Sequence, residues 1–357
     1  MTTEAVDSAP APPPAGPEAA PAGPGGPPPP GSLRLLRLLT GTWIAQSVHA
    51  VAELDVADRL AAGPRAAADL AAEAGADAGA LFRVMRALVP PGVFEEPEPG
   101  VFALGELGEF LRSDVPGTQK YSALLFGAET FRSWAEVLHS VRTGEPAFPA
   151  VYGSSFYEYL DRHEKVAETF NRTMGAGGMV PPVARSFDFT GHRHVVDVGG
   201  GSGALLAAVL SWEPGLTGTL FDLPEAVAEP EEAITGRFSE RCSIVTGSFF
   251  DEVPGGGDVY LLSRVLHNWN DADAGSILRN VRAAMRPGSR LLVFERLLPD
   301  AASEHIGALF DLVMLVVLGG RERTLHEYAA LLEGAGLEVV RSADGPRDMG
   351  VVEARAV

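Results

Sequence analysis

The second half of the chain alternates short apolar runs with longer stretches of helical spacing. The apolar runs are Val195–Val198, Gly218–Phe221, Cys242–Gly247, Asp258–Leu262 and Arg290–Phe294. Helix-like stretches such as Asp271–Met285 separate them. This pattern is typical of a parallel sheet that is buried on both faces, so we predict an α/β domain over residues 186–357.

Two further apolar runs, Leu337–Arg341 and Gly350–Ala354, close the chain with no long helix between them. Parallel neighbours need a long crossover, whereas strands joined by a short connection pair antiparallel. We therefore expect an antiparallel pair among the last strands of the sheet. A dinucleotide-binding sheet would not have such a pair.

The first third of the chain has helical spacing followed by a hairpin pattern. The helical stretches are Leu33–Leu39, Trp43–Leu54, Arg65–Ala74 and Ala80–Leu88, and two short strands are expected over 92–96 and 101–104, around Pro99–Gly100. This order predicts a winged-helix-like domain over residues 32–118. Such a module can bind DNA or serve in dimerisation. We favour dimerisation, because Arg65, Arg83 and Arg86 are too few for a face that tracks phosphates.

Residues 119–185 form a helical segment between these two domains. Its large side chains include Phe126, Phe131, Trp134, Phe148, Tyr152, Phe156, Tyr157, Tyr159, Phe170, Met174 and Met179. A stripe of this kind is commonly core. However, ligand sites concentrate where domains meet, so both interpretations stay open and some of these residues are candidates to line an acceptor site.

Composition narrows the class of protein. Residues 1–31 are mostly Pro, Ala and Gly, which predicts a disordered tail. The net charge of −19, from 47 acidic and 28 basic residues, argues against a nucleic-acid partner. The longest apolar run, Leu312–Leu318, is too short for a membrane span, and the N-terminus does not read as a secretory signal. The single cysteine, Cys242, cannot form an internal disulfide, so we expect a cytoplasmic protein.

The stretch His194–Leu206 predicts a strand, a glycine loop and a helix in succession. Gly199, Gly201 and Gly203 lie in G-x-G-x-G order, whereas a dinucleotide fingerprint is G-x-G-x-x-G. Without Cβ atoms, the loop lets a ligand lie against the main chain, and we expect its N–H groups and the following helix N-terminus to face that ligand. A tight turn without a ligand is the alternative.

Residues at the ends of the next two strands suggest that the ligand contains a nucleoside. Asp222 ends the second strand, about twenty residues after the glycine loop, where an acidic residue can accept both hydroxyls of a ribose. Ser248 and Phe249 follow the third strand, and could hydrogen-bond and stack on a purine. The alternatives are a solvated Asp222 and aromatic packing, which is as good an interpretation for Phe250.

A histidine and two acids follow the later strands. His267 comes just after the fourth strand, where a histidine can take a proton near neutral pH, although a structural role is the alternative. Glu295 ends the fifth strand, and Glu322 comes shortly before Thr324–Glu327, which reads as a capping box. We expect both acids to converge on His267, unless each merely pairs with a neighbouring Arg. We expect Asp271 to cap the following helix. The remaining histidines show no ligand spacing, so no metal site is predicted.

Together, five motifs resemble those of the class I S-adenosylmethionine-dependent O-methyltransferases. They are Val196-Asp-Val-Gly-Gly-Gly-Ser-Gly, Phe221-Asp-Leu-Pro, Gly247-Ser-Phe-Phe, Leu266-His-Asn-Trp-Asn-Asp and Gly319-Gly-Arg-Glu-Arg-Thr. The nearest groups are the plant caffeate-type enzymes and the bacterial polyketide and antibiotic tailoring enzymes. The resemblance runs from the Leu35 region to the end. It implies a Rossmann-like class I methyltransferase sheet with an N-terminal winged-helix-like dimerisation domain whose helices interlock in a homodimer.

The resemblance also assigns roles to particular residues. It implies a general base at His267, held by Glu295 and Glu322. Cofactor contacts are implied at Asp197, Gly199, Gly200, Gly201, Asp222, Leu223, Ser248, Phe249 and Ser263. Contacts to the acceptor are implied at Phe170, Met174, Asn268 and Trp269. The family usually has Asp where Ser248 stands, and its plant members have Lys where Ser263 stands.

From these observations we predict methyl transfer from S-adenosylmethionine to a hydroxyl, expected to be phenolic, of an aromatic secondary metabolite. Some relatives use the same fold for a step that does not transfer methyl, but they lack the histidine that this chain keeps. Two different functions also stay open. One is a nicotinamide oxidoreductase, and the second is a winged-helix regulator that senses a nucleoside.

Overall fold

The computed structural model describes residues 30–176, 180–228, 230–301 and 305–357. The chain divides into two units, with the division between Ala45 and Gln46. The first unit contains α1 (Gly31–Leu39) and the start of α2 (Gly41–Glu53). The predicted tail lies outside the described residues up to residue 29, and so does Met179 of the aromatic stripe.

The second unit begins with a small helical module that contains a three-stranded antiparallel sheet. Its elements are α3 (Val56–Leu60), β1 (Arg65–Ala66), α4 (Ala67–Ala74), α5 (Ala78–Ala87), β2 (Phe94–Glu98), β3 (Val101–Leu104) and the 3-10 helix Gly108–Leu111. The strand order is β1-β3-β2. The prediction of one helix over Arg65–Ala74 was wrong at its start, because Arg65 and Ala66 pair with β3 before the helix begins. The Arg65 guanidinium is bound to Glu73 rather than left open for a phosphate.

A run of short helices follows. They are α6 (Lys120–Gly127), α7 (Glu129–Trp134), α8 (Val137–Thr143), α9 (Ala147–Tyr152), α10 (Phe156–Leu160), α11 (Glu164–Ala176) and the 3-10 helix Pro182–Ser186. Phe148, Phe156 and Leu160 are buried together with Val316 and Val317 from the π-helical turn Met314–Leu318, which follows α15 (Gly307–Val313). Much of the aromatic stripe is therefore core, as one of the two interpretations proposed. Phe170 and Met174 are only partly buried.

The rest of the chain forms a mixed sheet. Its elements are β4 (His194–Val198), α12 (Ala204–Trp212), β5 (Thr217–Asp222), α13 (Glu232–Thr235), β6 (Cys242–Thr246), β7 (Val259–Ser263), the 3-10 turn Leu266–Asn268, α14 (Asp271–Ala284), β8 (Arg290–Leu298), β9 (Arg323–Thr324), α16 (Leu325–Gly334), β10 (Leu337–Asp344), the 3-10 turn Pro346–Asp348 and β11 (Met349–Ala356). The strand order is β10-β11-β8-β7-β4-β5-β6, and β9 pairs with the end of β8. Strands β4 to β8 are parallel.

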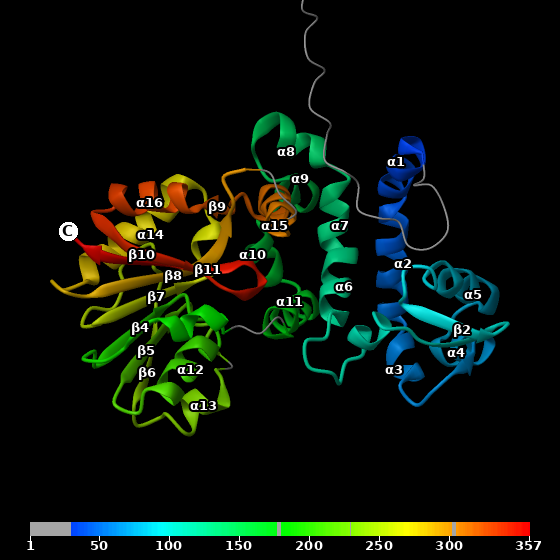
Figure 1. Ribbon diagram of the computed structural model, residues 1–357, viewed down its shortest axis with the longest axis horizontal. Helices are drawn as coiled ribbons and strands as arrows, with labels where there is room; N and C mark the ends of the chain where they lie inside the picture. The colour runs from blue at the N-terminus through cyan, green and yellow to red at the C-terminus, as the bar shows by residue number, and fades with distance from the viewer. Residues whose placement is uncertain (1–29, 177–179, 229, 302–304) are drawn as a thin grey trace, which may run out of the picture. The chain divides into compact units, whose positions relative to one another are not determined.

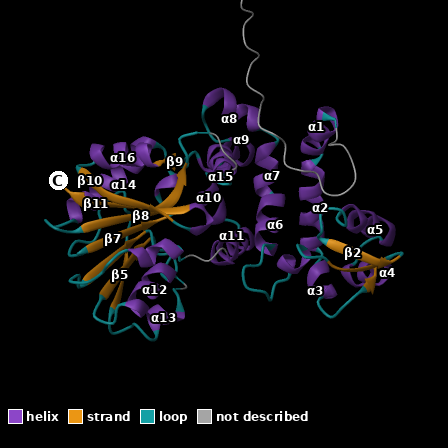
Figure 2. Ribbon diagram, viewed as in Figure 1, coloured by secondary structure: helices purple, strands orange, loops and turns teal. Residues whose placement is uncertain are grey.

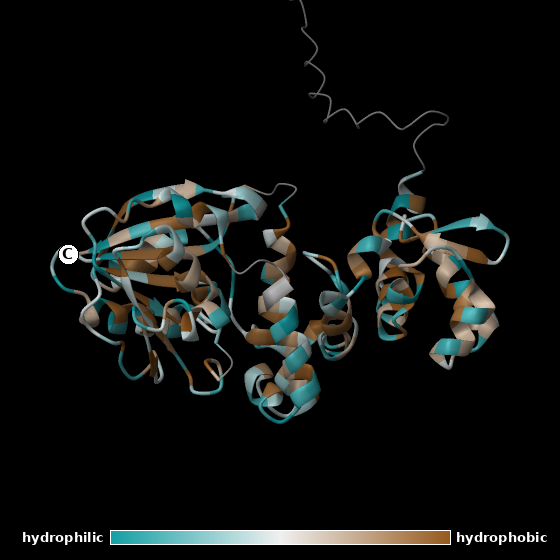
Figure 3. Cartoon of the chain, turned by 90° about the horizontal axis from the view of Figure 1, so that it is seen from below, coloured by the Kyte–Doolittle hydropathy of each residue, from teal (hydrophilic) through white to brown (hydrophobic). Residues whose placement is uncertain are grey.

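The predicted antiparallel pair is confirmed. β11 lies between β8 and β10 and runs antiparallel to both, with Val352 opposite Val293 and Ser342 opposite Val352. Each face of the sheet has its own core. Val196, Val198 and Leu262 pack under α14 and α16, whereas Val195, Leu220 and Leu261 pack under α12 and α13. Figures 1 and 2 show these helix pairs on opposite sides of the strands, and Figure 3 shows the apolar colour along the strands.

The strand register brings the predicted site residues to one edge. Asp197 pairs with Leu261 of β7, and Ser263 at the end of β7 pairs with Phe294 of β8. The glycine loop, Asp222, Ser263 and Glu295 therefore all lie at the carboxyl edge of the parallel strands. The chain crosses to opposite sides of β4, since β4 lies between β5 and β7. Ligands bind outside the carboxyl ends of strands at such a switch point. In the part of the chain that the structure describes, no helix has the length and apolarity to span a bilayer.

Candidate active site

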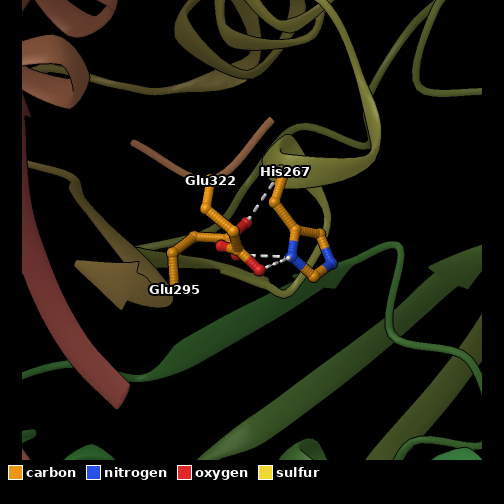
Figure 4. Close-up of side chains that lie close together, drawn as sticks. All are labelled: His267, Glu295 and Glu322. Carbon is orange, nitrogen blue, oxygen red and sulfur yellow. Dashed lines mark hydrogen bonds and ion pairs between the residues drawn. The ribbon is translucent and has the colours of Figure 1, made fainter. Parts of the chain in front are cut away.

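His267 and the two predicted acids form one buried cluster. The Nδ1 atom of His267 lies 3.0 Å from Oε1 of Glu322 and 3.7 Å from Oε2 of Glu295. The exposed fractions are 4% for His267, 0% for Glu295 and 1% for Glu322. Figure 4 shows both carboxylates gathered at one ring nitrogen, while the second ring nitrogen points away from them. The expectation that both acids converge on His267 is confirmed.

The two acids hold different parts of the histidine. Glu322 accepts from the ring, whereas Oε1 of Glu295 accepts the backbone N–H of Leu266 at 2.8 Å and that of His267 at 3.3 Å. Glu295 can reach these groups because β8 lies beside β7, which leads into the turn Leu266–Asn268. A carboxylate only accepts, so Nδ1 carries the proton and the lone pair of the neutral ring lies on Nε2.

The pKa of each member of the cluster follows from burial and its neighbours. Burial opposes the charged ring of His267, but the two carboxylates outweigh it and raise the His267 pKa above its ordinary value. Burial raises the pKa of Glu295. Burial also acts to raise the Glu322 pKa, but His267 and the Arg296 and Arg264 guanidinium groups lower it. Glu322 is therefore the ionised partner of the ring.

The two helices next to the cluster, α14 and α16, are capped at their N-termini, but only α16 in the way that the sequence predicted. Thr324 and Glu327 form the predicted capping box at the start of α16. The prediction that Asp271 caps α14 was wrong. The side chain of Asn270 accepts the N–H of Asp273 instead, and Asp271 is the first helical residue. The Asp271 carboxylate binds Arg323, 2.7 Å away.

The glycine loop forms as predicted, and the N–H groups of its four glycines all have partners within the protein. Those of Gly199 and Gly200 donate to the carbonyl of Phe221, and that of Gly203 donates to the carbonyl of Gly200. The N–H of Gly201 donates to Oδ2 of Asp222 at 2.8 Å. A phosphate-binding loop needs such groups free. The glycine N–H groups of this loop are therefore not free to bind phosphate oxygens, and the loop suits a ligand without a diphosphate.

Asp197 lies directly beneath this loop. It is 1% exposed, and neither carboxylate oxygen has a hydrogen-bond partner at normal distance among the described residues. A Cβ on Gly200 would lie 2.7 Å from its Oδ2 atom. Burial and the neighbouring Asp222 raise the pKa of Asp197 to about 7. The backbone N–H of Leu206 opposes this rise only weakly, and a buried carboxylate without a closer partner fits a ligand with a positive charge.

Asp222 is fixed at the end of β5 by two backbone donors. Besides Gly201, the N–H of Leu223 donates to its Oδ1 atom at 2.7 Å. Each carboxylate oxygen keeps a further lone pair that a ribose hydroxyl can use. Burial raises the pKa of Asp222. The adjoining Leu223 side chain is 43% exposed, which leaves an apolar surface beside the carboxylate.

Two aromatic rings of the loop after β6, Phe249 and Phe250, pack with Trp269, which follows the turn Leu266–Asn268. Phe249 lies against the glycine loop, since a Cβ on Gly199 would be 3.4 Å from its ring. The Phe250 and Trp269 rings pack edge to face at 4.7 Å, and Trp269 also contacts Phe249. Trp269 thus packs on Phe249, which the resemblance implies at the cofactor, and the acceptor contact implied for Trp269 stays a prediction. The Ser248 hydroxyl accepts the N–H of Phe250 at 3.2 Å and keeps its own proton to donate.

The remaining implied residues lie around the end of β7. Ser263 is the last residue of β7, and the Asn268 side chain donates to the Arg264 carbonyl at 3.3 Å. Met174, on α11, lies at the same place, because Nη2 of Arg264 is 3.4 Å from its sulfur. Phe170, one turn earlier, packs edge to face on Phe156 at 5.4 Å. The structure therefore brings α11 to the strand end that carries His267.

Two arginines of this region, Arg264 and Arg296, carry no signal in the sequence, whereas Tyr157, which lies near them, belongs to the aromatic stripe considered for the acceptor site. Arg264 has a φ of 57°, a strained conformation for a side chain other than glycine, and its charge acts on both acids. Tyr157 is 37% exposed as a whole, but desolvation of its hydroxyl raises the phenol pKa to about 12, and the charges of Arg264 and Asp222 act on it. Arg296 lies 3.5 Å from Glu322. Backbone strain and charges buried by distant segments leave no mark on sequence periodicity, so no pattern could have identified the two arginines.

The cluster also has the ligand types of a metal site. His267, Glu295 and Glu322 each offer one atom within 4.8 Å of the others. However, Nδ1 and Glu322 already share a hydrogen bond, and the Arg296 guanidinium approaches the same Glu322 oxygen. A divalent cation would have to displace the His267–Glu322 hydrogen bond and lie close to the positive charge of Arg296. The arrangement fits proton transfer better, and the absence of a metal stays a prediction.

Comparison with known proteins identifies the class of protein. An O-methyltransferase domain matches residues 134–338, and an O-methyltransferase dimerisation domain matches residues 36–114. The chain belongs to the O-methyltransferase family and is a class I S-adenosylmethionine-dependent enzyme. Membership of this family argues against both the nicotinamide oxidoreductase and the regulator.

Three similar proteins illustrate the relationship. The chain is 40% identical to phenazine O-methyltransferase PhzM of Lysobacter antibioticus, over 90% of this chain and 96% of that one. It is 41% identical to the mitomycin biosynthesis 6-O-methyltransferase of Streptomyces lavendulae, over 89% and 93%. The crystal structure of NcsB1, an O-methyltransferase of neocarzinostatin biosynthesis, contains S-adenosylmethionine and 2-hydroxy-5-methyl naphthoic acid. It superposes with a TM-score of 0.77 at 38% identity, covering 88% of this chain and 96% of that one.

The residues at the carboxyl edge fit S-adenosylmethionine. The cofactor has an α-ammonium and a sulfonium but no phosphate, which agrees with the buried Asp197 carboxylate, which lacks a partner at normal hydrogen-bond distance, and with a loop whose glycine N–H groups are satisfied internally. It also has a ribose, which agrees with Asp222. The same features do not suit a dinucleotide, whose diphosphate would need free N–H donors.

Proposed function

We propose that this enzyme methylates a phenolic hydroxyl of an aromatic secondary metabolite, with His267 as general base. The observation that carries the proposal is the His267–Glu322 pair, in which one ring nitrogen is held by a carboxylate and the second is turned away from it (Figure 4). A phenol has a pKa near 10, so little phenolate is present at neutral pH and a base is useful. A base whose pKa is raised above that of ordinary histidine suits this task.

In this mechanism Nε2 of His267 accepts the hydroxyl proton as the phenol oxygen becomes nucleophilic. Glu322 accepts the Nδ1–H hydrogen bond and stabilises the imidazolium that forms. Glu295 keeps the backbone of Leu266 and His267 in place. When bound, S-adenosylmethionine supplies an electrophilic methyl group. General-base help of this kind contributes about 10²–10⁴-fold, and holding the reactants in line contributes the larger part.

For the cofactor, we propose the residues at the carboxyl edge. Asp222 accepts the ribose hydroxyls, and Leu223 covers the sugar from its exposed position. Phe249 and Ser248 flank the adenine, with the Ser248 hydroxyl as donor where the family usually has a carboxylate acceptor. Asp197, Gly199, Gly200 and Gly201 hold the methionine part, and Ser263 completes the site from β7.

For the acceptor, we propose the region of Phe170, Met174, Asn268 and Trp269. The observation that supports it is the contact between Met174 and Arg264, which places α11 beside the His267 loop. The relatives support the class of acceptor. The names of the first two refer to phenazine and mitomycin chemistry, and NcsB1 binds a hydroxynaphthoic acid. A flat aromatic ring with a free hydroxyl is therefore the acceptor that we expect.

Mass spectrometry tests the proposed reaction. The protein is incubated with S-adenosylmethionine and hydroxylated phenazines, naphthoic acids and benzoic acids, and both the methylated product and S-adenosylhomocysteine are quantified. His267→Ala should reduce turnover strongly while S-adenosylhomocysteine binding survives. Undiminished methylation by that variant would remove His267 from the mechanism. Formation of another product without methyl transfer would favour the non-methylating alternative.

We also propose a homodimer, because the chain contains the family's dimerisation domain. The N-terminal helices carry large apolar side chains that remain exposed, among them Leu38 at 77% and Trp43 at 70%. Apolar surfaces of this kind mark interaction sites. A second copy of the chain is the partner that the domain predicts.

A further inference from the structure

Arg323 is the largest fully buried side chain among the described residues, and its charge is permanent. It lies in β9, immediately after Glu322, and β9 pairs in parallel with the end of β8. Burying a guanidinium is unfavourable unless every donor is satisfied. The partners of this group therefore show what it holds in place.

All five N–H groups of Arg323 are used. Nε and Nη2 donate to Oδ1 of Asp271 at 3.0 and 2.7 Å, and Nη1 donates to the Arg321 carbonyl at 3.3 Å. The remaining two donors reach backbone carbonyls on either side of His267. Nη1 donates to Leu266 at 3.0 Å, and Nη2 donates to Trp269 at 2.8 Å. One rigid fork thus spans the turn that carries the proposed base.

The residues just before Arg323 contact the same turn. The N–H of Arg321 donates to the carbonyl of His267 at 2.9 Å. A Cβ on Gly320 would lie 2.1 Å from that carbonyl oxygen, so only glycine allows this approach. The segment Gly320–Arg323 therefore supplies Glu322 to the ring of His267 and, at the same time, holds the His267 backbone.

We propose that Arg323 is a positioning residue for methyl transfer, which keeps the His267 ring against Glu322 by fixing the backbone on both sides of the histidine. This inference rests on the proposed role of His267. Lysine would keep the positive charge and could keep the contact with Asp271. Its single ammonium cannot span the carbonyls of Leu266 and Trp269 as a planar fork does.

The test compares Arg323→Lys with Arg241→Lys. Arg241 is a matched control, because its guanidinium also binds several backbone carbonyls, those of Leu210, Glu213, Pro214 and Leu216. It precedes β6, at the opposite edge of the sheet from His267. A purely structural role for Arg323 predicts that both variants lower the melting temperature and leave the chemistry of the base unchanged.

The proposal predicts a different outcome for Arg323→Lys alone. We expect kcat to fall by about 10²-fold, the loss typical of a small misplacement at a reacting group. The KM for S-adenosylmethionine should stay close to that of the unchanged enzyme. The acidic limb of the pH–rate profile should move to lower pH, because a longer Nδ1–Glu322 contact lowers the His267 pKa. Charge loss cannot cause this shift, because lysine is also positive.

The His267 titration can also be followed without an acceptor, by NMR of imidazole-labelled protein with bound S-adenosylhomocysteine, with His267→Asn used for assignment. A lowered pKa in Arg323→Lys and an unchanged pKa in Arg241→Lys support the proposal even if the proposed acceptor class is wrong. An unchanged His267 titration in a folded Arg323→Lys protein overturns it.

If Arg323→Lys does not fold, Gly320→Ala carries the same test, because its Cβ pushes on the His267 carbonyl without changing any charge. A folded Gly320→Ala protein with an unaltered His267 titration would overturn the proposal as well.

Discussion

The Nδ1 atom of His267 is 3.0 Å from Glu322 but 3.7 Å from Glu295, so the two acids do not play equal parts. Glu322 faces the ring, and Glu295 accepts two backbone N–H groups of the turn. The sequence placed both acids near the histidine without distinguishing them. The difference leads to the first prediction.

Glu322→Gln should reduce kcat by about 10–100-fold, because the imidazolium loses its charged partner. Glu295→Gln should cost less activity, since an amide oxygen still accepts the N–H groups of Leu266 and His267. Steady-state kinetics with a saturating acceptor, together with the melting temperature, separates the two effects. Equal losses of kcat in the two variants would contradict the assignment of Glu322 to the ring.

The raised pKa of His267 predicts a pH dependence of activity. A general base must be unprotonated, so kcat/KM should rise with pH through a midpoint above 6.5, the ordinary histidine value. The profile is measured from pH 5 to 9 with Glu322→Gln in parallel, whose midpoint should lie lower. A wild-type midpoint below the ordinary histidine value would show that the carboxylates do not hold the proton on the ring.

The same pKa predicts a pH dependence of stability. Because the folded-state pKa of His267 is raised, its contribution to the free energy of unfolding is fully present below the unfolded-state pKa and is lost as pH rises through the folded-state value. The difference in melting temperature between the wild type and His267→Asn should therefore shrink between pH 6 and 9. A difference that grows over this range would have the wrong sign for a raised pKa.

Asp197 predicts that cofactor binding is linked to a proton. Its pKa of about 7 in the protein without ligand means that an approaching ammonium must find it ionised or expel its proton. The affinity for S-adenosylhomocysteine should rise as pH increases through about 7 and level off about one pH unit higher, where Asp197 is fully ionised. Isothermal titration calorimetry at several pH values tests this expectation. Asp197→Asn should bind more weakly and lose the pH dependence, and a variant that keeps the wild-type profile would exclude Asp197 as its source.

Gly200 and Gly215 form a matched pair for testing the glycine loop. A Cβ on Gly200 would lie 2.5 Å from Leu220 and 2.7 Å from Asp197, whereas one on Gly215 meets nothing within 4 Å. Gly200→Ala should destabilise the protein by about 1–3 kcal/mol and weaken S-adenosylhomocysteine binding, and Gly215→Ala should do neither. Thermal melts with and without the ligand give both quantities. Normal ligand binding by Gly200→Ala would show that the close approach of the loop is not needed.

The proposed dimer predicts that charge on the N-terminal helices lowers the oligomeric state. Leu38→Glu places a carboxylate at a position that is 77% exposed in the single chain, and Val340→Glu on β10 places one at a position that is 45% exposed. Only the first should produce monomers in size-exclusion chromatography with light scattering. A monomeric wild type, or a dimeric Leu38→Glu protein, would place the interface elsewhere or exclude it.

The pattern of apolar residues was enough to locate the parallel strands and the ligand edge of the sheet. Periodicity identifies strands β4 to β8, and the carboxyl ends of parallel strands must meet at one edge. Residues at or shortly after the ends of those strands, such as Asp222 and His267, could therefore be placed together from their positions in the chain alone. The antiparallel pair of β10 and β11 followed from the short connection between them.

Only the tertiary structure decided which polar groups form hydrogen bonds and ion pairs with each other. The glycine N–H groups of the loop are used internally, Asn270 rather than Asp271 caps α14, and Arg323 binds the backbone on both sides of His267. The physical reason is that hydrogen bonds and buried charges depend on atoms that distant segments bring within about 3 Å of each other. The periodicity of apolar residues indicates which face of a helix or strand is buried, but it does not indicate which side chains or backbone groups of other segments contact that face.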